Sequence, residues 1–426
     1  MQKQNKTVCV VGLGYVGLPL AMRSLERGYQ VIGFDLDQKK NASINQGKSP
    51  IEEKFLDEYF EKFKLKATDN PKEIKKADII LVCVPTPVDE KFYPNLGPVK
   101  GAMETIAKNL KKGALVVLES TVNPGVSEEV VRPIFEAGGL KVGRDVFIAH
   151  CPERINPGDP KWNVTNIPRV VGSFDKKGLK IALDFYRSIV DADIRPMKSI
   201  REAEAVKIVE NSFRDINIAF VNELAKSFEM LDIDVKDVIE GASTKPFAFM
   251  AHFPSCGVGG HCIPVDPYYL IERAKQSGFD HKFLKIAREI NNSMPDYTVE
   301  LLQDALNEVE KPLKGTKVGV LGLSYKANVD DLRESPSLKI IKLLEKSGAK
   351  VLIFDPHIKS KSNVKTLNEL LKKSEALILA TNHNEFEYLD GELLKKNNVQ
   401  VLIDGKNMFD KKKFKKHGII YKGIGR

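Results

Sequence analysis

Long apolar segments and regularly spaced cysteines are both missing from this chain of 426 residues. No apolar run approaches the roughly 18 residues that a membrane helix requires. The five cysteines are odd in number and lack zinc-ribbon spacing, and residues 1–6 are polar and lead directly into an apolar strand, without the apolar core of a signal peptide. We therefore expect a reduced, cytoplasmic protein that does not insert into a membrane.

The basic residues are not gathered into the pattern that nucleic-acid binding requires. The formal charge is +9, and an excess of lysine can serve nucleic acid, acidic lipid or an anionic small molecule. Most lysines are interleaved with Asp and Glu. The densest run, residues 411–416, holds one aromatic residue where a single-strand stacking platform needs several. The pattern predicts a solvated helix face and no nucleic-acid partner.

A glycine-rich turn near the amino terminus lies between a predicted strand and a predicted helix. Residues 7–11 and 30–34 are rich in β-forming side chains, and a helical pattern runs between them. Asp35, about 20 residues beyond the turn, would accept hydrogen bonds from the adenosine ribose and repel a 2′-phosphate. This βαβ unit predicts NAD rather than NADP as cofactor. The expected cofactor contacts are Gly12, Gly14, Tyr15, Val16, Gly17 and Asp35.

Three further predicted strands each end in a polar or proline-bearing loop. They span residues 79–84, 115–119 and 146–149. Loops at the carboxyl ends of strands line the ligand crevice of an open parallel sheet, so these loops are candidate walls of the site. Pro85, Thr86, Thr121, Glu153 and Arg154 lie in these loops and are candidate contacts of the cofactor or the substrate.

The centre of the chain is predicted to be helical. Ser199 and Glu202 form a capping box, and apolar residues continue at helical spacing to about Leu231. A helix of about 30 residues is nearly three times the mean length, and such a helix commonly serves as a strut or a dimer seam. A second helical stretch is expected from about residue 282 to 292, resuming after Pro295.

The carboxyl-terminal part repeats the pattern of the amino terminus. Residues 318–325 and 351–355 again have the order strand, glycine turn, helix, strand and aspartate. Ser324 stands where Gly14 stood and the third glycine is missing, so a second NAD is not expected. The predicted fold class is α/β, with two Rossmann-like doubly wound parallel-sheet domains joined by a long central helix. The predicted domains are residues 1–198, 199–312 and 313–426.

Cys262 lies in a glycine-rich loop with Asp266 four residues later. Such a loop is unusual for a core strand, but a buried free cysteine usually behaves as a small hydrophobe, so a reactive and an inert thiol both stay open. A thiol is useful when an aldehyde must be oxidised again, because the thiohemiacetal can lose hydride and leave a thioester that water cleaves. A zinc site at Cys256, His261 and Cys262 lacks a fourth ligand, so no metal is expected.

Three other polar residues each have two interpretations. Lys207 and Asn211 would project from one helix face and could stabilise a developing oxyanion, where a good donor is worth about 3 kcal/mol. A snorkelling lysine and a satisfied core asparagine are the alternative. Glu153 follows a strand end and a proline, a suitable place for a carboxylate that activates water. An ion pair with Arg154 or another basic group is equally compatible with the sequence.

In the order of its motifs the chain resembles the UDP-glucose/GDP-mannose dehydrogenase family, the four-electron nucleotide-sugar 6-dehydrogenases, over nearly its whole length. The matching motifs are Gly12–Pro19, Val84–Pro87, Glu119–Val122, Pro152–Arg154, Lys207 with Asn211, Gly259–Cys262 with Asp266, and Arg333–Pro336.

The resemblance implies a role for each residue of the predicted reaction centre. It implies that Cys262 is the nucleophile and that Lys207 and Asn211 hold the oxyanion. It also implies that Asp266 and Thr121 order the catalytic water and the proton transfers.

By the same resemblance Glu153 is the base in thioester hydrolysis and NAD is the cofactor. The central region is then expected to form a homodimer, and the last domain to bind the nucleotide of a UDP-sugar substrate. Arginine and lysine suit a diphosphate by charge and geometry. The expected substrate contacts are Glu153, Arg154, Lys207, Asn211, Gly259, Lys326, Arg333 and Lys406.

Departures from the family pattern indicate a branch. The loop reads Gly-Gly-His-Cys where the UDP-glucose enzymes usually have Gly-Gly-Ser-Cys, and Pro157 stands where they tend to have a second glutamate. Residues 245–250 and the cysteine loop look like the UDP-N-acetylglucosamine 6-dehydrogenase branch. Lys406 replaces an arginine that many relatives carry, which puts the detail of that substrate contact in doubt.

We therefore expect NAD-dependent oxidation of the C6 hydroxyl of a UDP-N-acetylhexosamine, first of all UDP-N-acetylglucosamine, to the uronic acid for surface polysaccharide. UDP-glucose, UDP-N-acetylgalactosamine and UDP-N-acetylmannosamine are alternatives. An alternative from another class is a dinucleotide-sensing protein without turnover, against which the intact Cys262, Lys207, Asn211 and Asp266 argue.

Overall fold

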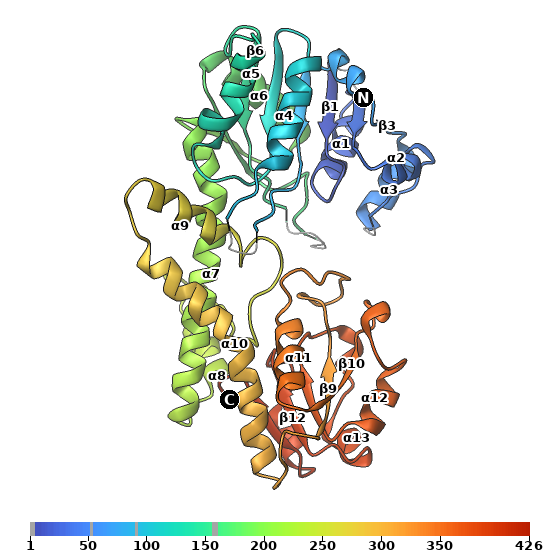
Figure 1. Ribbon diagram of the computed structural model, residues 1–426, viewed down its shortest axis with the longest axis vertical. Helices are drawn as coiled ribbons and strands as arrows, with labels where there is room; N and C mark the ends of the chain where they lie inside the picture. Colours follow the sequence, from blue (N-terminus) through green and yellow to red (C-terminus); the bar gives the residue numbers. More distant parts are fainter. Residues whose placement is uncertain (1–4, 52–53, 90–92, 156–160) are drawn as a thin grey trace. The chain divides into compact units, whose positions relative to one another are not determined.

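The computed structural model divides the chain into two compact units. The first contains Met1–Glu210 and Tyr268–Gly278, and the second contains Asn211–Pro267 and Phe279–Arg426. Each unit is built around one sheet (Figure 1). The predicted boundaries at residues 198 and 312 stay predictions. The structure describes residues 5–51, 54–89, 93–155 and 161–426, so Pro157 lies outside the described residues.

The first unit contains an eight-stranded sheet in the order β3-β2-β1-β4-β5-β6-β7-β8. Neighbouring strands are parallel except β6 and β7, so this sheet is not parallel throughout. The strand order reverses between β1 and β4, the switch point at which doubly wound folds bind ligands. The strands are β1 Thr7–Val11, β2 Gln30–Phe34, β3 Lys66–Thr68, β4 Ile79–Val82, β5 Ala114–Leu118, β6 Val146–His150, β7 Arg169–Ser173 and β8 Ile194–Pro196.

Helices cover both faces of this sheet. Along β1, Val8 and Val10 pack into one core, while Cys9 and Val11 pack into the other. Residues of α1, α3 and α6 complete the first core, and residues of α4 and α5 the second. Burial on both faces explains why the strands are apolar throughout instead of alternating. The helices are α1 Gly17–Glu26, α2 Gln38–Asn45, α3 Lys54–Lys62, α4 Gly97–Asn109, α5 Arg132–Ala137 and α6 Lys176–Ile189, with short turns η1 Pro71–Lys76 and η2 Ser127–Val131.

The long central helix α7, Ile200–Met230, begins where its capping box predicts. The Ser199 hydroxyl accepts the N–H of Glu202 at 3.1 Å, and the Glu202 carboxylate accepts the N–H of Ser199 at 3.2 Å. No helix among the described residues is long and apolar enough to cross a membrane. The cytoplasmic location stays a prediction. Two shorter helices follow, α8 Val235–Ser243 and α9 Asp266–Gln276.

The predicted interruption near Pro295 is wrong, because α10 runs without a break over Lys282–Asn307. A proline inside a helix removes one hydrogen bond and costs about 3 kcal/mol. Here Met294, Val299 and Leu302 are buried in one core on both sides of the proline. Tertiary packing of this face therefore outweighs the local preference to stop.

The second unit contains a five-stranded parallel sheet in the order β10-β9-β11-β12-β13. Helices α10 and α11 pack on one face, and α12, α13 and α14 on the other. The predicted fold class, with two Rossmann-like domains and a long central helix, is confirmed. The elements are β9 Lys317–Leu321, α11 Pro336–Lys346, β10 Lys350–Phe354, η3 Lys359–Lys361, α12 Leu367–Lys373, β11 Ala376–Leu379, η4 Asn384–Phe386, α13 Gly391–Lys396, β12 Val401–Asp404, α14 Lys411–Lys415 and β13 Ile420–Gly423.

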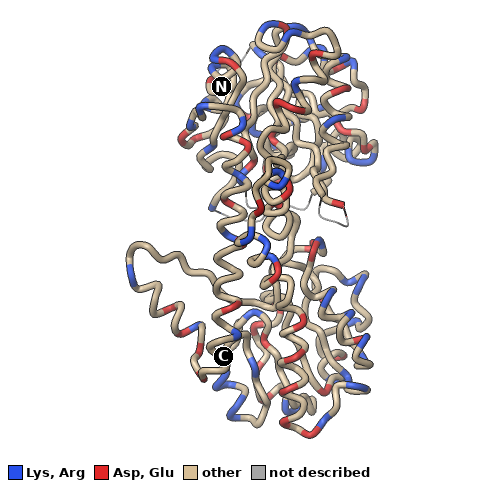
Figure 2. Tube along the Cα trace, turned by 60° about the vertical axis from the view of Figure 1, so that its left-hand side comes forward, with Lys and Arg blue, Asp and Glu red and all other residues tan. Residues whose placement is uncertain are grey.

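Charges of both signs are interspersed along the two units (Figure 2). The densest lysine run forms α14, where Phe414 is buried in the core and most of the lysines are exposed. Lys411 forms an ion pair with Asp234 at 2.8 Å. The run thus has the solvated helix face that its spacing predicts.

Candidate active site

The glycine turn after β1 has the shape that a dinucleotide requires. Gly12 has a φ of +91°, and a Cβ at Gly17 would lie 1.9 Å from the Gly12 carbonyl oxygen. A Cβ at Gly14, in contrast, would meet no atom within 4 Å, so the outer side of the turn is open to a ligand. Helix α1 begins at Gly17, so the turn leads directly into a helix amino terminus, where a phosphate group is favoured. Tyr15 is exposed and Val16 half-buried.

Asp35 follows β2, where an adenosine ribose would bind. Burial opposes its charge, but the N–H groups of Asp37 and Leu13 and the Lys40 ammonium hold the pKa of Asp35 below its usual value. The Lys40 Nζ atom lies 2.9 Å from the carboxylate. This lysine was not identified from the sequence, although its position five residues after Asp35 could have indicated it. The carboxylate is therefore ionised, as recognition of ribose hydroxyls requires.

The loops after β4 and β5 are held by residues that the sequence analysis did not single out. Pro85 is exposed, whereas Thr86 is buried and its carbonyl accepts the Tyr269 hydroxyl. The loop that carries the half-buried Thr121 is bound by Glu204 of α7. The Glu204 carboxylate accepts two N–H groups of this loop, from Gly125 at 2.6 Å and Ser127 at 2.8 Å. A lone buried acid in an apolar helix stripe was the available signal.

Glu153 pairs with an arginine that is distant in sequence. One of its oxygens accepts Arg169 Nη2 at 2.7 Å, and the other accepts the N–H groups of Arg154 and Ile155, each at 2.6 Å. The Arg154 guanidinium binds Glu210 instead, at 2.5 Å. The ion pair considered for Glu153 is therefore made with another basic group, Arg169 of β7.

Helix α7 carries the two donors predicted for the oxyanion. Lys207 and Asn211 are one turn apart and both are half-buried. The Asn211 amide donates to the Asp266 carboxylate, with Nδ2 and Oδ2 2.5 Å apart. The structure thus brings Asn211 and Asp266 together and leaves a basic group one turn earlier on the same helix.

The cysteine loop packs on the carboxyl-terminal domain within the second unit. Gly260 has a φ of +87° and donates its N–H to the Arg333 carbonyl at 2.9 Å. A Cβ at Gly260 would lie 2.8 Å from the Tyr325 ring, and one at Gly259 would lie 2.8 Å from the Glu334 carbonyl oxygen. These glycines let the loop approach closely. Cys262 itself is exposed.

Arg333 and Lys406 are basic groups near the cysteine loop. The hydrogen bond to Asp331 raises the pKa of Arg333, and the nearby Cys262 acts in the same direction. Burial lowers the pKa of His261, as does the charge of Arg333. Lys326 is half-buried in the same domain. Lys406 is half-buried and close enough to Cys256 for its charge to act on that thiol. Burial raises the pKa of Cys256, and the charge of Lys406 opposes the rise.

Asp355 occupies in the second domain the place that Asp35 has in the first, but its carboxylate is buried and bound by its own chain. It accepts the N–H groups of Leu323 at 2.6 Å, His357 at 2.8 Å and Ile358 at 2.9 Å. His383 also lies 3.1 Å from it. This carboxylate therefore has no oxygen left for ribose hydroxyls.

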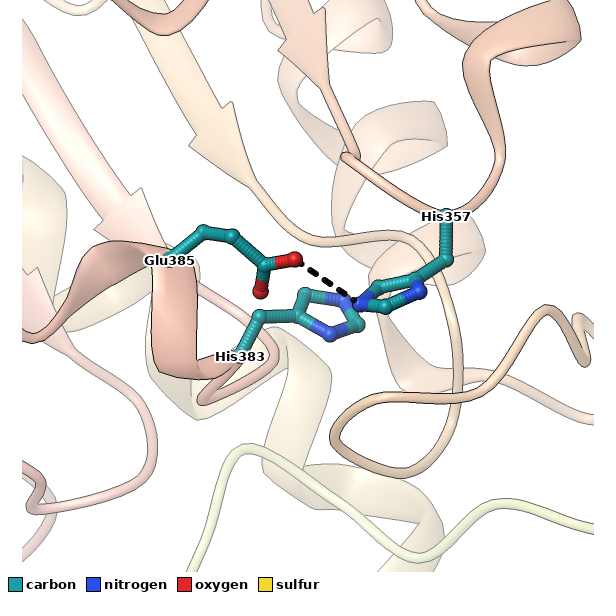
Figure 3. A group of neighbouring side chains, drawn as sticks. All are labelled: His357, His383 and Glu385. Carbon is teal, nitrogen blue, oxygen red and sulfur yellow. Dashed lines mark ion pairs between the residues drawn. The ribbon is translucent and has the colours of Figure 1, made fainter. Parts of the chain in front are cut away.

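A group of possible metal ligands lies beside it. Figure 3 shows His357 and Glu385 pointing toward one another next to the His383 ring, and His357 Nε2 is 3.3 Å from Glu385 Oε1. His383 Nδ1 accepts the N–H of Asn328 at 2.9 Å, while its Nε2 is bonded to Ser324 and Asp355. Both nitrogens of this ring are therefore occupied, and the remaining two groups are too few for a structural metal site.

Three domain models of one family match most of the chain. Residues 6–190 match the NAD binding domain of the UDP-glucose/GDP-mannose dehydrogenase family, residues 201–293 its central domain and residues 319–411 its UDP binding domain. The chain belongs to this family. The chain is therefore an NAD-dependent oxidoreductase, a nucleotide-sugar dehydrogenase with a UDP binding domain. The predicted family, cofactor and enzyme class are confirmed.

Relatives of the dehydrogenase cover nearly the full chain. The UDP-N-acetyl-D-mannosamine dehydrogenase of Pyrococcus horikoshii is 35% identical over 98% of this chain and 99% of its own. The UDP-N-acetyl-D-glucosamine 6-dehydrogenase of Pseudomonas aeruginosa is 37% identical over 95% and 98%. The solved structure of the Pyrococcus enzyme superposes with a TM-score of 0.93 over 99% of both chains, at 35% identity.

Proposed function

We propose that this dehydrogenase oxidises the C6 hydroxyl of a UDP-N-acetylhexosamine twice, to the uronic acid, with UDP-N-acetylglucosamine as the first candidate. Two full-length relatives are named for UDP-N-acetylhexosamines. The Gly-Gly-His-Cys loop resembles the N-acetylglucosamine branch. UDP-N-acetylmannosamine is the second candidate, because the relative from Pyrococcus, with the higher coverage, is named for that sugar.

The observation that carries the proposal is the arrangement around the cysteine loop. Cys262 is exposed, and the buried Asp266 four residues later donates its N–H to the Cys262 carbonyl at 2.8 Å and accepts the Asn211 amide. An exposed thiol beside a held carboxylate and amide supports a nucleophile with its proton partner. An inert core cysteine would be buried like Cys256.

In the proposed reaction the C6 hydroxyl gives its proton to a water held by Thr121 and Asp266 and loses a hydride. The thiolate of Cys262 then bonds to the carbon of the resulting aldehyde, and the carbonyl double bond becomes a single bond to a negative oxygen. NAD, when bound, accepts the hydride in each oxidation. Lys207 and Asn211 stabilise the negative oxygen of the thiohemiacetal, and loss of hydride from this adduct leaves a thioester.

Hydrolysis completes the proposed reaction. The oxygen of a water that Thr121 and Asp266 orient bonds to the thioester carbon while Glu153 takes a proton from that water. The carbon–sulfur bond then breaks, which releases the uronic acid and returns the sulfur as thiolate. Lys326, Arg333 and Lys406 are proposed to bind the nucleotide, Gly259 and Arg154 the sugar, and the glycine turn with Asp35, Pro85 and Thr86 the cofactor.

The NADH yield tests the function. With limiting sugar and excess NAD, we expect two NADH for each UDP-N-acetylglucosamine consumed, measured by absorbance, and a uronic acid as product, measured by mass spectrometry. The panel includes UDP-glucose, UDP-N-acetylgalactosamine and UDP-N-acetylmannosamine. A yield of one NADH would refute the four-electron reaction, and a higher kcat/KM for another sugar would replace the first candidate.

We also propose a homodimer formed through the central helices. Large apolar side chains of the second unit are exposed, and on α7 Phe213 and Phe220 have exposed fractions of 49% and 53%. Exposed large apolar side chains on the central helices support a partner surface that covers them. Other exposed apolar side chains from the end of α7 to α10 include Met230, Leu231, Ile233, Val238, Phe247, Phe249, Met250, Phe253, Phe279, Phe283 and Ile286.

Replacing Phe220 with glutamate tests the homodimer. We expect the parent protein to have twice the chain mass of 47.6 kDa in solution and Phe220→Glu to have the mass of one chain. A buried charge without a partner would destabilise the interface. Light scattering measures both masses, with Tyr388→Glu, an exposed aromatic of the carboxyl-terminal domain, as control. A parent with the mass of one chain would contradict the proposal.

A further inference from the structure

A buried polar cluster lies at the carboxyl ends of β5 and β6 in the first unit. Glu119 follows β5, Glu153 follows β6, and both carboxylates contact the guanidinium of Arg169 at the start of β7. The exposed fraction of the Arg169 side chain is 1%, and that of Glu119 is 0%. Glu119 lies within one of the motifs that carry the family resemblance, which gives it no role, and no local pattern in the sequence indicates Arg169.

We propose that Arg169 is a positioning residue for Glu153, and that Glu119 and Tyr186 set how strongly the guanidinium holds that carboxylate. This inference rests on the proposed role of Glu153 as the base in thioester hydrolysis. In the proposed reaction Arg169, Glu119 and Tyr186 contact neither substrate nor cofactor. They act only through Glu153.

The geometry fixes both oxygens of Glu153. Arg169 Nη2 is 2.7 Å from one oxygen, and the N–H groups of Arg154 and Ile155 bind the other. Arg169 Nη1 is 3.0 Å from Glu119, and the Tyr186 hydroxyl donates to the second oxygen of Glu119. The guanidinium carbon also lies 5.6 Å from the centre of the Tyr186 ring. Arg169 therefore binds the base, and Glu119 binds Arg169.

The attraction between Arg169 and Glu153 depends on the charges of the other groups in the cluster. Two carboxylates share one guanidinium, so one negative charge is in excess when both are ionised. Burial raises the pKa of Glu119 to about 7, although the charge of Arg169 opposes the rise. The remaining titratable neighbours are Tyr186, Cys83 and Cys151, and burial raises the pKa of each, so they are neutral near pH 7. Glu119 is therefore the group whose charge changes near neutral pH.

The charge of Glu119 changes the pull of Arg169 on Glu153. While Glu119 is ionised, the guanidinium is shared and Glu153 accepts a proton from water more readily. When Glu119 is neutral, Arg169 attracts Glu153 alone and favours its charged form, which makes it a weaker base. Removing the charge of Glu119 should therefore slow thioester hydrolysis and move the acidic limb of its pH profile downward.

Single-turnover hydrolysis tests this coupling. The thioester on Cys262 is formed from the sugar nucleotide that the parent enzyme oxidises, and its loss is followed against pH by mass spectrometry of the intact protein. For Glu119→Gln we expect an acidic limb about one pH unit lower than in the parent and slower hydrolysis at the plateau. Tyr186→Phe removes a hydrogen bond that stabilises the charged form of Glu119. It should therefore cause a smaller shift of the acidic limb in the same direction. Arg169→Gln should shift the limb upward.

Controls separate this effect from loss of structure and from failure of the proposed function. Arg23→Gln removes another buried guanidinium, which binds Asp191 and the Ile189 carbonyl, and should leave the profile unchanged. If Arg169→Gln does not fold, the pH profiles of Glu119→Gln and Tyr186→Phe test the inference. Unmoved profiles in these two folded variants overturn the inference. The parent's NADH yield is measured separately, so two NADH with unmoved profiles rejects the inference alone, whereas one NADH rejects the proposed function and with it this role of Arg169.

Discussion

Cys262→Ser is expected to lower kcat by at least about a thousandfold while NAD binding is unchanged. A serine hydroxyl stays protonated at neutral pH and is a much weaker nucleophile than a thiolate. The side chain is exposed, so the substitution should not disturb packing. The glycine turn belongs to the first unit and Cys262 to the second, which is why we expect separable effects. Steady-state kinetics and NAD titration by fluorescence measure them.

The matched control for this substitution is Cys256→Ala. The Cys256 thiol is buried and lies 3.5 Å from the Ala380 carbonyl oxygen, so its removal should lower the melting temperature and preserve the yield of two NADH. Truncating a buried side chain leaves a cavity. If Cys262→Ser has the steady-state rate of the parent enzyme, Cys262 is not the nucleophile.

Gly17→Ala is expected to destabilise the NAD domain by about 3 kcal/mol or more, or to prevent its folding. The new Cβ would lie 1.9 Å from the Gly12 carbonyl oxygen and 3.1 Å from a Val10 methyl group. The carbonyl belongs to the turn itself, so relief requires a shift of the backbone that binds the pyrophosphate. Thermal unfolding followed by circular dichroism measures the loss.

Gly14→Ala makes the comparison specific, because it adds the same methyl group three residues earlier in the same turn. No atom lies within 4 Å of the new Cβ, so we expect a melting temperature close to that of the parent. The methyl group would stand where the pyrophosphate must approach, so the KM for NAD should rise by about tenfold or more. Folded Gly17→Ala protein with parental NAD affinity would contradict this account of the turn.

Much of the fold could be predicted because the relevant signals are local. The glycine turn, the capping box at Ser199 and the apolar strands each depend on residues within one or two turns of chain. The end of β4 was placed two residues too late, at Val84 instead of Val82. The interruption at Pro295 was predicted from local preference, and packing of Met294 and its neighbours overrode it.

The candidate site was predictable only as a set of residue types. The motifs indicated Cys262, Asp266 and Asn211, and the structure adds that Asn211 donates to Asp266 across 55 residues of sequence. The contacts of Glu153 with Arg169 and of Gly125 with Glu204 carried no local signal of pairing. The catalytic roles of Cys262, Asp266, Asn211 and Glu153 stay proposals.

By itself the sequence determined the fold class, the family and the chemistry that each motif can support, because periodicity, turn glycines and reactive side chains are properties of neighbouring residues. Only the tertiary structure decided which charges meet. Glu119 and Arg169 are 50 residues apart, and they form a pair because β5, β6 and β7 lie side by side in one sheet. Burial at that edge then raises the pKa of Glu119, since removing a carboxylate from water favours its neutral form.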